Sequence, residues 1–226
     1  KEMSTTLKYS KDKKVVFDEG PHTYMLGKRQ LTSVTTFLSR FKNSFDREGI
    51  SKAYAKKHKM TQEEVLADWD QKRDFSCEMG SAVYKIFEDY IDGKGIVASG
   101  TYPKEQVAID FIYDYFVSGK LTPIESELIV YDTKKGLAGQ IDCLAKKPDG
   151  TIVMLDWKTN KELNDTGFAG QRMKQPYTHL QDCNLNHYAM QLDTYKSMCK
   201  EYDIKKTFIV HIGFDKYQVI ETKEIL

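Results

Sequence analysis

The chain has 226 residues, of which 40% are hydrophobic and 30% are charged, a composition typical of a soluble globular protein. Its formal net charge of +1 argues against a protein that coats nucleic acid through overall charge, although a local basic groove remains compatible with it. No apolar run approaches the ~18 residues that a membrane span needs, so no membrane partner is expected.

The cysteines give no framework for a metal cluster. Four are present, and no two of them form a Cys-x-x-Cys pair: Cys77, Cys143, Cys183 and Cys199. A structural zinc site and an iron–sulfur cluster are therefore not expected. Reduced thiols and a polar N-terminus without an apolar signal core favour a cytoplasmic protein.

The first half of the chain predicts two short strands followed by helices. Strands are expected over residues 14–18 and 22–26, and a helix capped by Thr32 or Ser33 over 34–41. Further helices are expected over 45–59, over 61–74 with a capping box of Thr61 and Glu64, over 78–91, and over 103–118. Lys52 and Lys56 share one face of the second helix, which is either a solvated surface or a ridge that contacts phosphates.

The second half predicts an antiparallel meander. Residues 137–145 and 151–157 flank the turn Pro148-Asp149-Gly150, in which proline presets φ and glycine allows positive φ. A strand over 124–131 precedes them. Residues 160–182 form a long polar loop, which in a compact domain favours a function such as covering a substrate. A helix over 184–202 and strands over 206–214 and 218–222 follow.

Three polar side chains are expected to converge on this hairpin. Side chains alternate along a strand, so Asp156 and Lys158 point to the same side, and strand pairing can bring Asp142 there. With the backbone carbonyl of Trp157, the two carboxylates offer the oxygen ligands that Mg²⁺ prefers. Such a site suits phosphodiester hydrolysis, in which Lys158 positions water or stabilises charge on the phosphate. The tripeptide alone is unspecific, because most such pairs are solvated.

The order of several weak motifs is more specific. A helix with Gly80 and Glu88 is followed by a strand with Glu127, then by Gly139-Gln140-Ile141-Asp142, then by an apolar strand into Asp156-Trp157-Lys158-Thr159, and finally by a helix with Gln191 and Tyr195. This order resembles the PD-(D/E)XK nuclease superfamily, and most closely its RecB-like and lambda-exonuclease-like branch, which includes phage exonucleases. The resemblance covers roughly residues 78–200, and residues 22–34 are similar to the N-terminal part of phage members.

The resemblance implies roles for individual residues. It implies that Asp142, Asp156 and the Trp157 carbonyl bind Mg²⁺, with Mn²⁺ as a substitute, and that Lys158 is the catalytic lysine. Gln191 and Tyr195 are implied to be catalytic residues on the adjoining helix. Together with the basic clusters, it predicts DNA as the partner, with contacts from Tyr84, Ser33, Lys52, Lys56, Thr159 and Arg172.

One position departs from the pattern. The branch has a His or Glu ligand four residues after the helix glycine, whereas this chain has Tyr84, and a neutral phenol is a poor Mg²⁺ ligand. Glu88, one turn further on, is one replacement, and Glu127 from its strand is another. A third alternative is a protein that is impaired as a nuclease and acts by binding DNA.

These observations predict an α+β fold with a restriction-endonuclease-like core, in which helices flank a mixed sheet that contains the meander. Residues 1–226 are expected to form a single domain, with 1–75 as an N-terminal hairpin and helical elaboration. The predicted function is a Mg²⁺-dependent DNA exonuclease of replication, recombination or repair, in the cytoplasm of a bacterium, such as a phage-infected one. The alternative is a nuclease-fold module that binds DNA or a replication or recombination protein.

Overall fold

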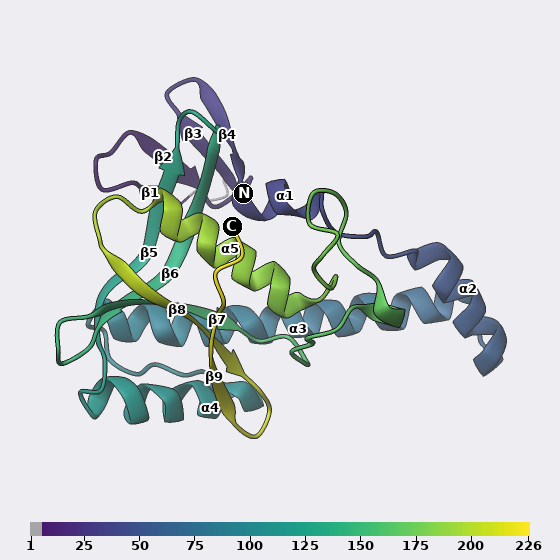
Figure 1. The fold of residues 1–226 in the computed structure, drawn as a ribbon. Coiled ribbons are helices and arrows are strands. Elements are labelled where there is room, and N and C mark those ends of the chain that lie inside the picture. The colour runs from purple at the N-terminus through teal and green to yellow at the C-terminus, as the bar shows by residue number, and fades with distance from the viewer. Residues whose placement is uncertain (1–5) are drawn as a thin grey trace.

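The computed structural model describes residues 6–226 and has an α+β architecture, as predicted (Figure 1). In this part of the chain one mixed sheet has nine strands in the order β1-β2-β3-β4-β6-β7-β8-β9, with β5 paired to β6. The strands are β1 (Leu7–Tyr9), β2 (Val15–Asp18), β3 (Thr23–Leu26), β4 (Arg29–Ser33), β5 (Thr122–Asp132), β6 (Leu137–Lys146), β7 (Ile152–Lys158), β8 (Ile204–Ile212) and β9 (Tyr217–Glu221). The helices are α1 (Val34–Ser39), α2 (Arg47–His58), α3 (Gln62–Ile91), α4 (Pro103–Phe111) and α5 (Asn184–Met198), with a π-helical turn η1 (Ile112–Val117) and a 3₁₀ turn η2 (Phe168–Gly170).

The predicted meander of β5, β6 and β7 is confirmed, and all of its pairings are antiparallel. Gly150 has φ +88° in the turn between β6 and β7, the conformation for which glycine is suited. The sheet is mixed because β4 pairs with β6 and β7 pairs with β8 in parallel. The hairpin therefore lies in the interior of the sheet.

Both faces of the hairpin are covered, so its strands read as nearly continuous apolar runs. On one face Leu144 and Met154 pack in a cluster with α1 and α5. On the other face Cys143 and Leu155 pack in a cluster with α3 and α4. Because side chains alternate along β7, Asp156 belongs to the face that α5 covers, and Trp157 points to the face of α3.

The helix α3 corrects one prediction. Residues 61–74 and 78–91 were expected to form two helices, but they form one helix of 30 residues, because neither glycine nor proline interrupts residues 75–77. The predicted capping box is confirmed, with Thr61 Oγ1 accepting from Glu64 N at 3.1 Å. The helix also continues past residue 75, where the N-terminal elaboration of the domain was expected to end. Figure 1 shows α2 at the end of α3 that lies away from the sheet.

Other helix ends differ from expectation by a few residues. The helix expected over 103–118 changes at Ile112 into a π-helical turn, and α5 ends at Met198 because Cys199 is extended (φ −76°, ψ 107°). Residues 160–182 form the predicted loop. Within residues 6–226, no helix is both long and apolar enough to cross a membrane.

Candidate active site

The three polar side chains of the hairpin lie together where β6 and β7 separate. Cys143 and Leu155 are the last paired residues at this end of the ladder, so Asp142 and Asp156 follow on facing strands. Asp142 Oδ2 accepts a hydrogen bond from the backbone N–H of Trp157 at 2.8 Å and thereby replaces a ladder bond. Lys158 Nζ lies 2.6 Å from Asp156 Oδ2.

The pKa values of Asp142 and Lys158 are both raised within this buried cluster. Burial first, and then the charge of Asp156, raise the pKa of Asp142 to about 8, although Lys158 and the Trp157 N–H act in the opposite direction. Burial alone would lower the pKa of Lys158, but the nearby Asp156 and Asp142 outweigh it and leave that pKa raised. Lys158 is therefore an ammonium at neutral pH, and the two carboxylates compete for its charge.

The donor set fits a hard divalent cation. Asp156 Oδ2 is buried, and its partner is the Lys158 ammonium at 2.6 Å. Within residues 6–226, no three His, Cys, Asp or Glu side chains are grouped to hold a metal on their own. The available oxygens are those of Asp142, Asp156 and the Trp157 carbonyl. Mg²⁺ is often bound by one or two carboxylates and keeps several waters, which matches this set.

Tyr84 lies beside that carbonyl as a hydrogen-bond donor. Its hydroxyl donates to the backbone oxygen of Trp157. Burial, followed by the charges of Asp142 and Asp156, raises the pKa of Tyr84 well above its ordinary value, so the phenol stays neutral. A carbonyl oxygen has two lone pairs, which leaves one free for a cation. Tyr84 thus supports the candidate ligand from the position at which the motif pattern predicts a His or Glu ligand.

Glu88 and Glu127 are held by a lysine that sequence reasoning missed. Lys8 of β1 contacts Glu127, and its Nζ lies 3.5 Å from Glu88 Oε1 and 2.7 Å from Glu19 Oε1. Glu127 lies between Ser126 and Leu128, which pair with Cys143 and Ile141 of β6, but its φ of +49° interrupts the alternation of the strand. The structure does not group either glutamate with Asp142 and Asp156, so their role as a third ligand stays a prediction that requires Lys8 to move away.

A groove of about 840 Å³ runs beside this lysine. Its walls come from β1, α3, β5 and the segment after β7, and they include Tyr84, Glu88, Glu127 and Thr159. Gly80 also lines it, and a Cβ there would lie 2.9 Å from Thr159 Oγ1. The glycine therefore lets α3 approach the residue that follows Lys158.

The helix α5 does not line this groove but packs on the other face of the hairpin. Gln191 Nε2 donates to Tyr195 OH at 3.0 Å, and Tyr195 is buried against Gly139, where a Cβ would lie only 2.2 Å from its ring. Tyr195 therefore positions Gln191. The ring of Tyr188, which the motif comparison did not single out, lies 4.7 Å from Lys158 Nζ; its place one turn before Gln191 is the signal that could have found it.

The remaining predicted contacts are divided between the site and distant surfaces. Thr159 lines the groove, whereas Ser33 caps α1 by accepting from Thr36 N at 3.1 Å. Lys52 pairs with Glu48 at 2.7 Å, and both Lys52 and Lys56 are exposed on α2. Arg172 donates to the carbonyl of His179 at 2.8 Å and so shapes its own loop.

Two buried residues remote in sequence fix the backbone after Lys158. Lys104 of α4 is 1% exposed and donates to the carbonyl of Thr159 at 2.6 Å. A nitrogen of His211 on β8 lies 2.7 Å from the carbonyl of Asn160. Burial lowers the pKa of Lys104. No local motif marks these residues, because α4 and β8 reach the site only through the tertiary fold.

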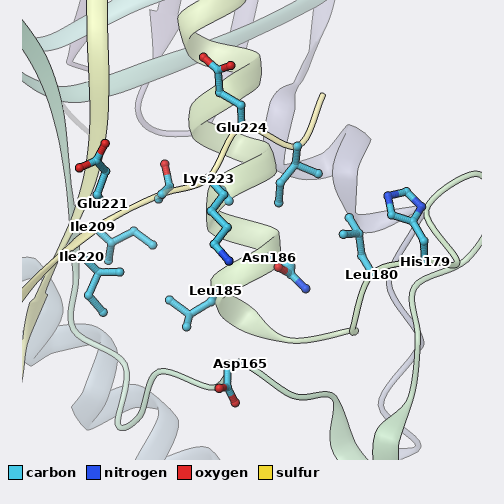
Figure 2. A pocket seen from close by; sticks show the side chains of 13 residues that line it. Asp165, His179, Leu180, Leu185, Asn186, Ile209, Ile220, Glu221, Lys223 and Glu224 are labelled. Atoms are coloured by element: carbon cyan, nitrogen blue, oxygen red, sulfur yellow. The ribbon is translucent and has the colours of Figure 1, made fainter.

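A second cavity, of about 500 Å³, lies between α5, β8, β9 and the C-terminal segment (Figure 2). Much of its wall is apolar, with Leu180, Leu185 and Ile209 among its residues, and Asp165 and Glu221 also line it. None of the predicted site residues lines it. The chemistry predicted from the sequence therefore belongs to the hairpin and its groove.

The comparisons with known proteins add no family. No protein-family model matches the chain, and no curated protein matches it in sequence. The solved structure of SSO0001 is similar to part of it, with 17% identity and a TM-score of 0.30 over 52% of this chain. The match spans 49% of SSO0001 and is too weak to support an argument about fold or function.

Proposed function

We propose that the chain is a metal-dependent DNA nuclease of the PD-(D/E)XK type. The observation that carries the proposal is the buried cluster of Asp142, Asp156 and Lys158, in which two carboxyl groups share one ammonium. A carboxylate oxygen held in this way is suited to a cation. The order of motifs around the cluster, and the packing of Gly80 and Gly139 against residues of the same site, support the same function.

In the proposed nuclease, each residue of the site has a separate role. Asp142, Asp156 and the Trp157 carbonyl would hold Mg²⁺, which when bound supplies Lewis-acid activation of water and of the phosphate. Tyr84 donates to that carbonyl and keeps it oriented. Lys158, charged at neutral pH, lies beside the carboxylates, where it can stabilise negative charge that develops on the phosphate. The groove beside α3 offers an approach for a nucleic-acid strand.

A second function has its own supporting observation. Tyr84 supplies no carboxylate, and Lys8 pairs with Glu88 and Glu127. The carboxylates left for the candidate metal position are therefore those of Asp142 and Asp156. These features favour a DNA-binding protein with an impaired metal site. The exonuclease preference over an endonuclease rests on the sequence resemblance alone.

Comparison of linear with closed circular DNA separates these functions. With Mg²⁺ or Mn²⁺, an exonuclease should degrade labelled linear DNA and spare the closed circle, an endonuclease should cut both, and a binding protein should shift both without cutting. Lys158→Ala should abolish cleavage, while the exposed Lys146→Ala at the other end of the hairpin should not. Absence of cleavage on every substrate with either metal refutes the enzyme. Circular dichroism of both variants checks that the fold is intact.

A further inference from the structure

The segment after α1 is fastened to the loop of residues 160–182 on both sides of Lys42. The carbonyl of Phe41 accepts from Lys174 N at 2.8 Å. Asn43 Nδ2 donates to the carbonyl of Arg172 at 2.8 Å, and Asn43 N donates to Asp182 Oδ2 at 2.7 Å. Lys42 is therefore carried by a backbone that is fixed at both neighbouring residues.

Asp182 is the carboxylate whose charge acts on Lys42, but both of its oxygens already contact other groups. Asp182 Oδ2 accepts from both the backbone and the side chain of Asn43, and Asp182 Oδ1 lies 2.5 Å from His187 Nε2. In the part of the chain that the structure describes, Lys42 Nζ has no ion pair within 4 Å and no hydrogen bond. Lys42 is thus a half-buried cation without an anion of its own.

Lys42 is connected to the region of the candidate catalytic lysine through α5. His187 and Tyr188 are adjacent on α5, and the Tyr188 ring lies 4.7 Å from Lys158 Nζ. The pKa of Lys42 is lowered, first by burial and also by the charge of Lys158, while Asp182 acts in the opposite direction. The charge of Lys42, after burial, likewise lowers the pKa of His187. Lys42 and Lys158 therefore lie within electrostatic reach of each other, and Lys158 already has a counter-ion whereas Lys42 has none.

We propose that Lys42 binds a second phosphate of the nucleic-acid strand, next to the phosphate that Lys158 serves. The identity of the ligand rests on the proposed function. A strand with one phosphate at Lys158 carries further phosphates on both sides of it, and a preformed unpaired ammonium is suited to receive one of them. Asn43 and Asp182 do not touch the ligand; they fix the backbone next to Lys42, and His187, bonded to Asp182, lies nearby as a reporter.

Binding to DNA without hydrolysis tests the site. A labelled single-stranded oligonucleotide in EDTA should bind Lys42→Gln about tenfold more weakly than the wild type, as for loss of one charge-assisted contact. The dependence of log affinity on log salt should become shallower by about 0.7, the value for one phosphate of a single strand. Lys42→Arg should retain both properties. So should Lys174→Gln, which removes an exposed lysine from the same loop. Equal affinity and salt dependence for the wild type and Lys42→Gln would overturn the proposal.

A probe that does not depend on DNA keeps the two proposals separable. Inorganic phosphate, titrated into the metal-free protein, should shift the ring resonances of His187, one of five histidines, in the wild type and not in Lys42→Gln. If this response is present while no DNA is cleaved, the nuclease proposal fails and the anion site stands. If DNA is cleaved while neither assay responds to Lys42, the anion site fails alone.

Discussion

Replacement of Gly139 by alanine tests the contact that sets α5 against the meander. A Cβ at this position would lie 2.2 Å from Tyr195 Cε1 and 3.0 Å from Cδ1 and Cζ. Carbon atoms pack at roughly 3.5–4.0 Å, so the ring must move by about 1 Å or more. Because Tyr195 is 5% exposed and packs in the core with Met190 and Leu192, α5 must shift with it.

The expected loss of stability follows from two opposing terms. Overpacking of a well-packed core costs about 1–3 kcal/mol. Gly139 does not have a positive φ, so alanine fits its backbone and restricts the unfolded chain, which returns about 0.4–1 kcal/mol. The free energy of unfolding should therefore fall by about 1–2 kcal/mol. Gln191, bonded to the Tyr195 hydroxyl, should be displaced as well.

Urea unfolding followed by circular dichroism, arranged as a double-mutant cycle, measures this contact. Tyr195→Ala removes the ring, so in its background Gly139→Ala should cost little. Tyr195→Phe keeps the clashing ring carbons and should preserve the full cost, which makes it the matched control. If Gly139→Ala and Tyr195→Ala add within about 0.5 kcal/mol, the ring does not lie on Gly139 and the placement of α5 is wrong.

Three further predictions concern the same site. In EDTA the folded chain keeps a proton on Asp142 up to about pH 8, whereas the unfolded chain releases it near pH 3.8. The free energy of unfolding should therefore fall as the pH rises between these values, by up to about 1.4 kcal/mol per pH unit. Urea titrations at pH 5 to 8 should show that Asp142→Asn removes this dependence on pH. Tyr84→Phe leaves the Trp157 carbonyl without its donor and should lower the free energy of unfolding by about 1–3 kcal/mol, measured by thermal and urea unfolding, and an unchanged value would show that the bond contributes nothing. Lys104→Met should leave the buried carbonyl of Thr159 unpaired at a similar cost, and single-turnover cleavage should slow because the residue after Lys158 is no longer fixed; the exposed Lys120→Met is the control.

The sequence was sufficient wherever local chemistry decides structure. The turn at Gly150 and the apolar runs beside it predicted the hairpin, and the alternation of side chains predicted that Asp156 and Lys158 share a face. The capping box at Thr61 also formed as expected. The sequence does not predict that the two helices merge into α3, because residues 75–77 have no strong preference for helix. A helix continues through them at no steric cost.

The rest of the site depends on long-range packing that no local pattern specifies. Lys8 reaches Glu127 across 119 positions of the chain, and Lys104 reaches Thr159 across 55. Tyr195 carries the expected motif, yet its role follows from the absent Cβ of Gly139 on another element. A sequence motif can predict which residues lie close together, but the partner that each side chain contacts depends on how the intervening elements pack.

The charges that surround the hairpin indicate how much metal the proposed nuclease needs. Asp142, Asp156 and Lys158 together carry one negative charge when both carboxylates are ionised, so one Mg²⁺ and one phosphodiester bring the cluster to neutrality. A carboxylate in place of Tyr84 would leave a negative charge and favour a second cation. Lys8 already supplies positive charge to the neighbouring glutamates. Tyr84 and Lys8 thus act in the same direction, and in the proposed nuclease the charge of this site favours one divalent cation over two.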